Sequence, residues 1–431
     1  MKPAGRIQAA AEVLEDVFER HQPAATALQD WGKRHRFAGS GDRAAIGTLV
    51  YDVLRRRLSL GAQMGSDGPR LLAVAAAPRA LGLSAEDVGR FCDGSPHAPA
   101  PLTDDERARL AAGFPADAPV HVAADVPEWL VGSFTRAFGD RAVAEGRAMA
   151  ERAPIDLRVN TLKATRDKVL AALAKLGAAP TRLAPFGLRI PAPEAAAKSP
   201  HVEAEAAHGK GWFEVQDEGS QLAAALSGAG PRQQVLDLCA GAGGKTLALA
   251  AAMQNTGQIY AYDSDKGQLR PIFARLQRAG VRNVQVLQGG DQEALEALGA
   301  RFDVVLVDAP CSGSGTWRRK PDAKWRLKPE ALANRQAEQR EVLALASRLV
   351  KPGGRLVYVT CSVLPEENTD QVAWFLETFP GFALMPFREV WRSAIGDEAP
   401  ASADGSDQTL LLTPGSHGTD GFFVASLKRT A

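Results

Sequence analysis

Apolar residues in the first ninety positions recur every three or four residues, which is the spacing of one helix face. The pattern includes Ile7, Val13, Leu14, Val17, Phe18, Ile46, Leu49, Val50, Val53 and Leu54. Strand-like alternation is absent there. Between Cys92 and Val126 the chain turns to Pro, Ala, Asp and Gly, which is typical of a linker or an irregular boundary. We therefore predict an all-helical domain over residues 1–125.

A second region mixes short elements of both kinds. Residues 126–139 resume a helical pattern. Residues 155–177 then indicate a short strand, a turn and a helix that ends at Gly177. We predict a small α+β subdomain over residues 126–230.

From Gln233 onward, strand-like runs alternate with helical stretches. The runs occupy residues 235–238, 259–263, 284–287, 302–308 and 355–360. This order implies right-handed crossovers and a mainly parallel sheet, and residues 408–428 add what looks like a closing β-hairpin. We predict an α/β Rossmann-like domain over residues 231–431. Functional side chains of such a domain gather beyond the carboxyl ends of its strands.

The amino-acid composition indicates the broad class of protein but not its function. The 431 residues are too many for one core, and 45% hydrophobic with 23% charged residues is ordinary for globular proteins. The net charge is +1, so a nucleic-acid partner would need a local basic face. Four scattered cysteines without a Cys-x-x-Cys pair predict neither a disulfide framework nor a metal site. No signal-peptide core or membrane-length run is present, so we expect a cytoplasmic protein without a membrane partner.

The run VLDLCAGAGGKT, residues 235–246, is a strand that enters a glycine-rich turn and then a helix. Such a turn holds a ligand on free backbone N–H groups. Cys239 replaces the first glycine of a Walker loop, and Thr246 replaces the third glycine of a dinucleotide loop. Asp237 at the mouth would repel phosphate but would suit the amino group and sulfonium of S-adenosylmethionine. We expect this cofactor on the turn residues Cys239, Ala240, Gly241, Ala242, Gly243 and Gly244.

Asp263 and Asp291 follow the next two strands, so that with Asp237 three carboxylates come in register after three successive strands, which favours the cofactor. Asp263 is placed to bond the ribose hydroxyls, and Asp291 to bond the adenine amino group. Each could instead be a helix cap or part of a solvated turn. Asp308, which ends the run at 302–308, is also counted among the cofactor-binding residues.

Two of the four cysteines follow strand-like runs, Cys311 in DAPCSGSG and Cys361 in TCS. Carbon 5 of cytosine is a poor nucleophile, and a thiolate that adds to carbon 6 would activate it for methylation. A free thiol, with a pKa of about 8.5, needs nearby cations or N–H groups to ionise at neutral pH. Asp308 could bond the cytosine amino group and N3. The alternative is that both cysteines are buried packing residues, but their Gly-, Ser- and Pro-rich settings favour chemistry.

Six motifs in order carry a resemblance to a known family. They are LRVNTLK (157–163), VQDEGSQ (215–221), LDLCAGAGGKT (236–246), DAPCSGSGTWRRKPDAKW (308–325), TCSVLPEEN (360–368) and GTDGFFVA (418–425). Over residues 126–431 the chain resembles the Sun/Nop-type RNA (cytosine-5) methyltransferases. The resemblance implies a class I methyltransferase domain, with Cys361 as nucleophile, Cys311 assisting product release, and Lys245 near cofactor and target base. Ala242 departs from the family, which usually has proline there.

The helical N-terminal segment is similar to the NusB-like RNA-binding domain that precedes this catalytic core in a bacterial ribosomal RNA enzyme of the family. We therefore expect RNA as partner, and small-subunit ribosomal RNA in particular. Two basic regions are candidate RNA contacts. The first comprises Lys33, Arg34, Arg36, Arg43, Arg55, Arg56 and Arg57, and the second Arg318, Arg319, Lys320, Lys324 and Arg326, flanked by Trp317 and Trp325.

Other functions remain as alternatives. A non-catalytic RNA-binding ribosome-assembly factor could retain the fold, although it would have no physical need to keep Cys361, Cys311 and Asp308 together. A DNA methyltransferase would use the cysteine of the Pro-Cys position, which leaves Cys361 unexplained.

Overall fold

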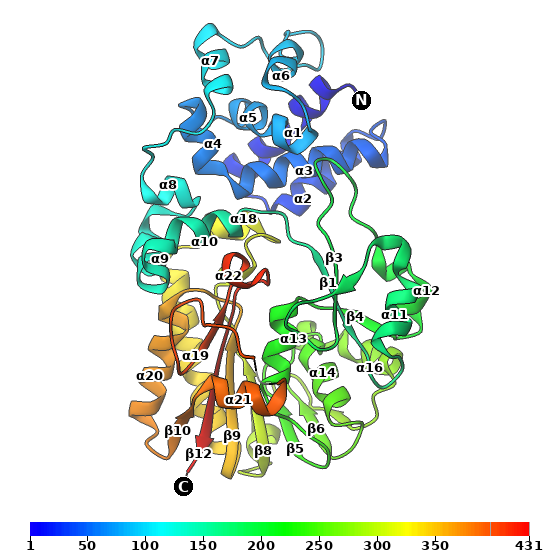
Figure 1. The fold of residues 1–431 in the computed structure, drawn as a ribbon, viewed down its shortest axis with the longest axis vertical. Helices are drawn as coiled ribbons and strands as arrows, with labels where there is room; N and C mark the ends of the chain where they lie inside the picture. The colour runs from blue at the N-terminus through cyan, green and yellow to red at the C-terminus, as the bar shows by residue number, and fades with distance from the viewer. Residues whose placement is uncertain (397, 431) are drawn as a thin grey trace.

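The computed structural model describes residues 1–396 and 398–430, which form a helical part, a small sheet and a large sheet (Figure 1). Positions 397 and 431 belong to the predicted catalytic range 231–431 and lie outside the described residues. The helical part forms one end of the molecule, and the large sheet with its helices forms the other.

The first 125 residues contain helices and no strand among the described residues. The predicted helical positions, such as Ile7, Leu14 and Leu49, are fully buried in one core. The helices are α1 (Pro3–Glu19), α2 (Ala24–Arg34), α3 (Ser40–Arg55), α4 (Arg57–Met64), α5 (Pro69–Leu81), α6 (Ala85–Phe91), α7 (Asp104–Ala112) and α8 (Val120–Ala124).

The stretch after Cys92 was expected to be a linker, and that prediction is wrong for α7. Thr103 accepts the N–H of Glu106 at 3.2 Å, and the Glu106 carboxylate accepts the N–H of Thr103 at 2.9 Å. This reciprocal capping box starts the helix despite the surrounding prolines and glycines. Leu110 is the residue that α7 buries.

The small sheet has four antiparallel strands in the order β2-β3-β1-β4. The predicted strand, turn and helix are confirmed as β1 and α11, and Gly177 ends the following turn in the left-handed conformation. The elements are η1 (Glu128–Leu130), α9 (Val131–Phe138), η2 (Gly139–Arg141), α10 (Ala142–Met149), β1 (Ile155–Val159), α11 (Arg166–Ala172), η3 (Ala174–Leu176), β2 (Ala179–Pro180), β3 (Gly187–Ile190), η4 (Val202–Ala204), α12 (Ala206–Gly209) and β4 (Phe213–Val215).

The large sheet follows the order β10-β12-β9-β8-β5-β6-β7, with β11 paired to β12. The strands β5 to β9 run parallel, while β12 is antiparallel to its neighbours. The strands are β5 (Gln234–Asp237), β6 (Gln258–Ala261), β7 (Val284–Val286), β8 (Phe302–Asp308), β9 (Val350–Thr360), β10 (Phe382–Met385), β11 (Leu410–Leu412) and β12 (Phe422–Arg429).

The sequence predicted seven of these eight strands and missed β10. The expected hairpin is an antiparallel β11–β12 pair, although the short helix α22 lies in its connection. The helices are α13 (Glu218–Ala225), α14 (Gly244–Ala252), α15 (Lys266–Leu269), α16 (Ile272–Ala279), α17 (Gln292–Glu296), η5 (Ser314–Thr316), α18 (Pro321–Arg326), α19 (Pro329–Leu349), η6 (Pro365–Glu367), α20 (Thr369–Thr378), α21 (Phe387–Ala394) and α22 (Pro414–His417).

Register brings the carboxyl ends of three strands together. Asp237 at the end of β5 pairs with Leu306 of β8, and Asp308 at the end of β8 pairs with Val359 of β9. The loops that follow β5, β8 and β9 therefore meet at one edge of the sheet.

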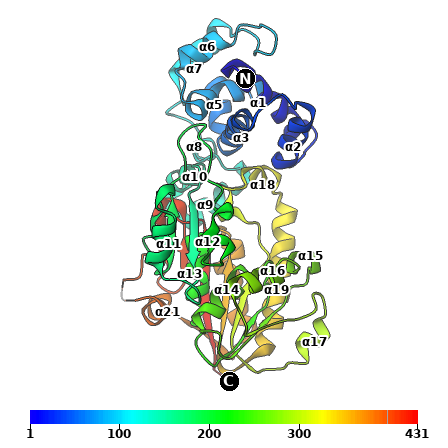
Figure 2. The ribbon, with the colours of Figure 1, turned by 90° about the vertical axis from the view of Figure 1, so that its right-hand side faces the viewer.

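The helical domain joins the catalytic part through α18, beside α2 (Figure 2). Lys324 of α18 donates to the carbonyls of Arg55, at 2.9 Å, and Asp125, at 2.5 Å. The N–H of Ala24, at the start of α2, donates to Asp322 at 3.3 Å. The junction residues Asp322 and Lys324 therefore come shortly after Cys311 in the sequence.

Candidate active site

The glycine turn after β5 has a backbone that few residues can adopt. Gly241 and Gly243 have φ angles of +51° and +82°, and Gly243 is the N-cap of α14. A side chain at Gly243 would place its Cβ 2.4 Å from Ile272, so only glycine fits there. The turn therefore brings backbone close to the sheet edge, as the sequence predicted.

Asp237 is a buried carboxylate at the mouth of this turn. Its side chain is fully buried, and Oδ2 accepts the Thr246 hydroxyl at 2.7 Å. Oδ1 has no hydrogen-bond partner among the described residues. Burial, with smaller contributions from Asp308 and Asp263, raises the pKa of Asp237 to about 7. A buried, unpartnered carboxylate oxygen fits a ligand that brings positive charge, such as the amino group or sulfonium of S-adenosylmethionine.

Asp263 and Asp291 follow β6 and β7, where the sequence placed them. Asp263 accepts the N–H of Gly241 and the N–H of Asp265, both at 2.8 Å. It therefore fixes the glycine turn and keeps further lone pairs for ribose hydroxyls. Asp291 caps α17 by accepting the N–H of Ala294 at 3.0 Å, so the capping alternative holds for one of its oxygens.

Lys245 and Asp308 form an ion pair of 2.6 Å between α14 and the end of β8. Lys245 is buried, and its ammonium lies 5.2 Å from the centre of the Phe422 ring. Burial lowers the pKa of Lys245, but the charge and hydrogen bond of Asp308 outweigh burial, and the pKa is raised overall. The structure thus brings together the predicted lysine and aspartate.

The two predicted thiols are in contact. The Sγ atoms of Cys311, after β8, and Cys361, after β9, lie 3.4 Å apart, and both residues are partly exposed. Cys361 also lies near Lys245, whose pKa a Cys361 thiolate raises. The hydrogen bond with Cys361 and burial raise the pKa of Cys311 well above its usual value. Cys92, in contrast, is buried in the helical core.

Serines and glycines lock the two cysteine loops to each other. The N–H of Gly315 donates to the Cys361 carbonyl at 3.0 Å, and the hydroxyls of Ser314 and Ser362 lie 2.9 Å apart. A side chain at Gly315 would place its Cβ 2.2 Å from the Gly421 carbonyl, so the Cys311 loop can lie against the segment before β12 only with glycine here. The sequence predicted the cysteines but not these supporting residues, although all of them lie in the six motifs.

The basic stretch after Cys311 is not a solvent-facing RNA surface, and the prediction is wrong for its main members. Arg318 is buried and pairs with Asp420 and Asp217. Arg319 pairs with Asp420 at 2.5 Å and Asp217 at 3.0 Å. Buried carboxylates from distant motifs neutralise these arginines, which a local sequence pattern cannot reveal.

The flanking residues have structural roles as well. Trp317 is buried and stacks on Phe134 at 6.2 Å between ring centres. Lys324 is buried in the domain junction, and the Trp325 indole donates to the Leu54 carbonyl at 2.6 Å. Of the predicted basic residues in this stretch, Lys320 and Arg326 are exposed.

The predicted basic residues of the N-terminal domain also fall into two groups, one in the domain junction and one exposed to solvent. Arg55 is buried and donates to the Arg318 carbonyl at 3.0 Å, and Arg56 pairs with Glu151 at 2.6 Å. Both belong to the junction. Lys33, Arg34, Arg36 and Arg43 are exposed and stay candidates for RNA contact, while Arg57 is half-buried over the Phe18 ring.

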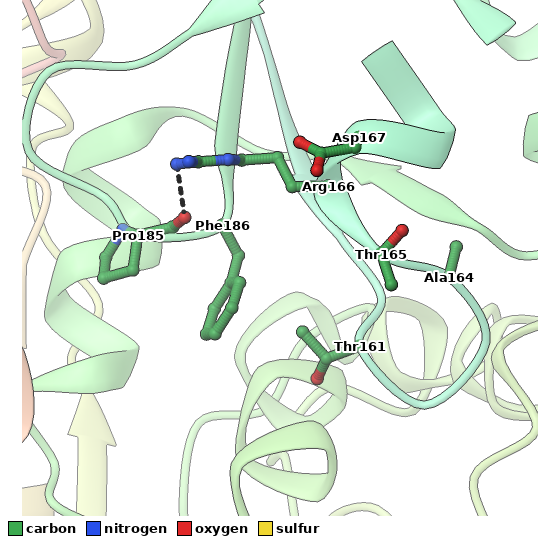
Figure 3. A pocket seen from close by; sticks show the side chains of 7 residues that line it. All are labelled: Thr161, Ala164, Thr165, Arg166, Asp167, Pro185 and Phe186. Carbon is green, nitrogen blue, oxygen red and sulfur yellow. Dashed lines mark hydrogen bonds between the residues drawn. The ribbon is translucent and has the colours of Figure 1, made fainter. Parts of the chain in front are cut away.

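A pocket lies away from these residues, on the small sheet domain. It has a volume of about 360 Å³, and Arg166 donates across it to the Pro185 carbonyl at 2.9 Å (Figure 3). Its lining is Thr161, Ala164, Thr165, Arg166, Asp167, Pro185 and Phe186. The predicted site is therefore a set of loops at a sheet edge, separate from this pocket.

Within residues 1–396 and 398–430, no cluster of three or more His, Cys, Asp or Glu side chains is arranged to hold a metal ion. None of the helices in this part of the chain has the length and apolar content to cross a bilayer.

Strand order, the glycine turn after β5 and the aspartates after the next strands define a Rossmann-like class I methyltransferase domain. The sequence pattern described as "16S rRNA methyltransferase RsmB/F" matches residues 225–428. The pattern of the ferredoxin-like domain of RsmF/B-like methyltransferases matches residues 126–196. The chain belongs to the RsmB/F family of S-adenosylmethionine-dependent methyltransferases.

Individual relatives agree with this assignment. The chain is 34% identical over 307 residues to the probable ribosomal RNA small subunit methyltransferase B of Synechocystis, a match covering 70% of this chain and 66% of the relative. The match thus spans just under two thirds of that relative. The fold also superposes on the crystal structure of PH0851 over 99% of each chain, with a TM-score of 0.73 and 27% sequence identity. A methyltransferase homologue from Pyrococcus horikoshii covers 72% of this chain and 97% of its own, with a TM-score of 0.59 and 30% identity.

Proposed function

We propose that this protein transfers a methyl group from S-adenosylmethionine to carbon 5 of a cytosine in small-subunit ribosomal RNA, through a covalent adduct with Cys361. The observation that carries the proposal is the pair of thiols at 3.4 Å, beside the Lys245–Asp308 ion pair and the glycine turn. The ribosomal RNA substrate is proposed because the relatives are named ribosomal RNA small subunit methyltransferase B.

Bound S-adenosylmethionine would supply an activated methyl group on a sulfonium. Asp237 would hold its positive charge and Asp263 its ribose, with Asp291 at the adenine. Residues 239–244 would enclose it with backbone, because the glycines leave no side chain in the way.

The reaction begins when the Cys361 thiolate adds to carbon 6 of the cytosine. The sulfur–carbon bond forms, and the electron pair of the ring double bond moves to carbon 5, which then accepts the methyl group. Lys245 stabilises the thiolate, and Asp308 accepts a hydrogen bond from the cytosine amino group. Next, a base takes the proton of carbon 5, the double bond reforms and the Cys361 thiolate leaves. Cys311, in contact with Cys361, assists this release.

The three parts of the chain divide the work in this proposal. Residues 1–125 are an RNA-binding domain, residues 126–230 extend the catalytic core, and residues 231–431 hold the cofactor and the cysteines. Lys33, Arg34, Arg36 and Arg43, which are exposed on the helical domain, would contact the RNA.

Bisulfite sequencing of ribosomal RNA tests the proposal. RNA from cells that have the gene should contain a cytosine that resists conversion, and deletion of the gene should make it convertible. Complementation with the unchanged gene should restore protection, whereas Cys361→Ala should not. Protection that persists after deletion at every cytosine, or that Cys361→Ala restores, contradicts the proposal. Ribosome assembly that depends on the gene while no cytosine changes would favour the non-catalytic assembly factor.

A further inference from the structure

Glu367, in η6, is a buried carboxylate that none of the proposed steps uses. Its side chain is fully buried. One oxygen accepts the N–H of Ser312 at 2.7 Å, and the other accepts the Ser312 hydroxyl at 2.5 Å. The Gln339 amide donates to Glu367 at 3.2 Å and to the Pro310 carbonyl at 2.9 Å. Glu367 and Gln339 thus hold the backbone on both sides of Cys311.

The hydrogen-bond donors around Glu367 favour its charged form. Burial raises the pKa of Glu367, while the donors from Ser312, Ser362 and Gln339 lower it in part. A carboxylate that accepts three hydrogen bonds can keep its charge in a buried site. The carboxylate therefore places a negative charge behind the Cys311 loop.

Four groups face Cys311, and taken together they disfavour its thiolate. They are the Cys361 thiol in contact with it, the Glu367 carboxylate, the buried Tyr358 hydroxyl and the N–H of Gly313. Of these, Cys361, then burial, then Glu367 raise the pKa of Cys311, and the Gly313 N–H alone lowers it. The charged neighbour of Cys361 is instead a cation, the Lys245 ammonium.

We propose that Glu367 is a positioning residue that keeps Cys311 a neutral thiol, so that the attacking sulfur is Cys361. The two sulfur atoms are neighbours, and without a charge difference either could add to the cytosine ring. The Glu367 anion behind Cys311 and the Lys245 cation beside Cys361 give the two thiols different roles. A neutral Cys311 also retains its proton during the attack and stays free for the release step. The consequence for catalysis rests on the proposed function, but the thiol chemistry does not.

Alkylation by iodoacetamide tests this inference without RNA or cofactor, so its failure is distinct from failure of the proposed function. The modification rate of each cysteine is measured by peptide mass spectrometry across a pH series in the whole protein. In the unchanged protein, Cys361 should react faster than Cys311 at every pH from neutral upward. Glu367→Gln keeps the shape but removes the charge. It should speed Cys311 alkylation several-fold, about tenfold for each unit by which the pKa of Cys311 falls, and leave Cys361 nearly unchanged.

Glu366→Gln is the matched control in the same turn. Glu366 faces α9, where it accepts the Ser133 hydroxyl at 2.7 Å, and its loss should leave Cys311 unchanged. Glu367→Asp, which restores the charge, should slow Cys311 again. A Glu367→Gln variant in which Cys311, Cys361 and Cys239 all react faster has merely loosened the loops, and this overturns the inference. Faster reaction of Cys311 than of Cys361 in the unchanged protein overturns it even if no variant folds.

Discussion

The sulfur atoms of Cys311 and Cys361 lie 3.4 Å apart, although fifty positions separate them in the sequence. Parallel pairing of β8 with β9 creates this contact, because it aligns Asp308 with Val359 and so starts both loops at the same height. The interlocked serines then hold the loops together. In the proposed mechanism the two thiols serve one target base in different roles, and their charged neighbours differ: Lys245 near Cys361 and Glu367 near Cys311.

Diamide should convert this pair into a disulfide. Each thiol gives up a proton and an electron, the sulfur–sulfur bond forms, and diamide is reduced to its hydrazine. The sulfurs need to approach only from 3.4 Å to about 2.05 Å. Intact-mass measurement should show the loss of two hydrogens, and peptide mapping should link Cys311 with Cys361. Cys311→Ser should abolish the link. A link from either cysteine to Cys239 instead would contradict the geometry.

Cofactor affinity should depend on the protonation of Asp237. Burial holds its pKa at about 7, so below that pH the proton must leave before the carboxylate can pair with a cation. Calorimetry should find that S-adenosylmethionine binds more weakly as the pH falls below 7, by up to about tenfold per pH unit. Asp237→Asn should bind weakly with no such dependence on this group. Equal affinity at pH 6 and pH 8 in the unchanged protein would refute the assignment.

The same residue predicts a stability effect of opposite sign. Its pKa is raised on folding, so without cofactor the free energy of unfolding falls as pH rises from about 4 to about 7. Cofactor-free Asp237→Asn should therefore unfold at a higher temperature than the unchanged protein at pH 8, and this difference should vanish near pH 4. Thermal unfolding followed by circular dichroism measures both. If Asp237→Asn is less stable than the unchanged protein at pH 8, the hydrogen bond from Thr246 to the charged carboxylate stabilises the fold by more than burial of that charge destabilises it.

Elements whose signal is local were predictable from the sequence. The runs ending at Asp237 and Asp308 are short, apolar and bounded by glycine or proline, so their strands were evident. The strand β10 was missed because Phe382–Met385 has no alternation and pairs only with the distant β12. Helix α7 carried a local signal, the Thr103–Glu106 capping box, which the surrounding prolines obscured.

The prediction that the basic stretch after Cys311 contacts RNA failed for a different reason. Whether Arg318 faces water or a carboxylate depends on Asp217 and Asp420, which lie about one hundred residues away on either side. Charge runs in a sequence carry no information about such partners. Glu367 was equally hidden, because its role depends on Ser312 in another loop.

Arg318 should matter for stability. Its removal takes one of two arginines from the buried carboxylate of Asp420 and leaves Arg319 as the remaining charged partner, and breaking a buried pair costs up to about 3–5 kcal/mol. Arg318→Ala should therefore lower the unfolding temperature clearly, whereas Lys320→Ala, at an exposed position two residues on, should not. Differential scanning fluorimetry compares them. Equal unfolding temperatures for both variants would mean that the Asp217–Asp420 network is not held by Arg318.

The two cysteines should fail in different ways during catalysis. Without Cys361 no adduct forms, so Cys361→Ala should bind RNA and S-adenosylmethionine yet transfer no methyl group. Without Cys311 the adduct and the methyl transfer still occur, but release of the product loses its helper. Cys311→Ala should therefore accumulate a covalent protein–RNA complex that survives denaturing electrophoresis. Each variant is incubated with target RNA and S-adenosylmethionine and then run on a denaturing gel.

The alternative outcomes of this experiment separate three mechanisms. A stable complex with Cys361→Ala but not with Cys311→Ala would reverse the roles, and Cys311 would be the nucleophile, as in DNA methyltransferases. If neither variant traps RNA and both still methylate it, the thiols are packing residues and the covalent route is wrong. The proposed route requires the trap in Cys311→Ala alone. Its disappearance in the double variant, which lacks both sulfurs, would show that Cys361 is the sulfur bonded to the RNA.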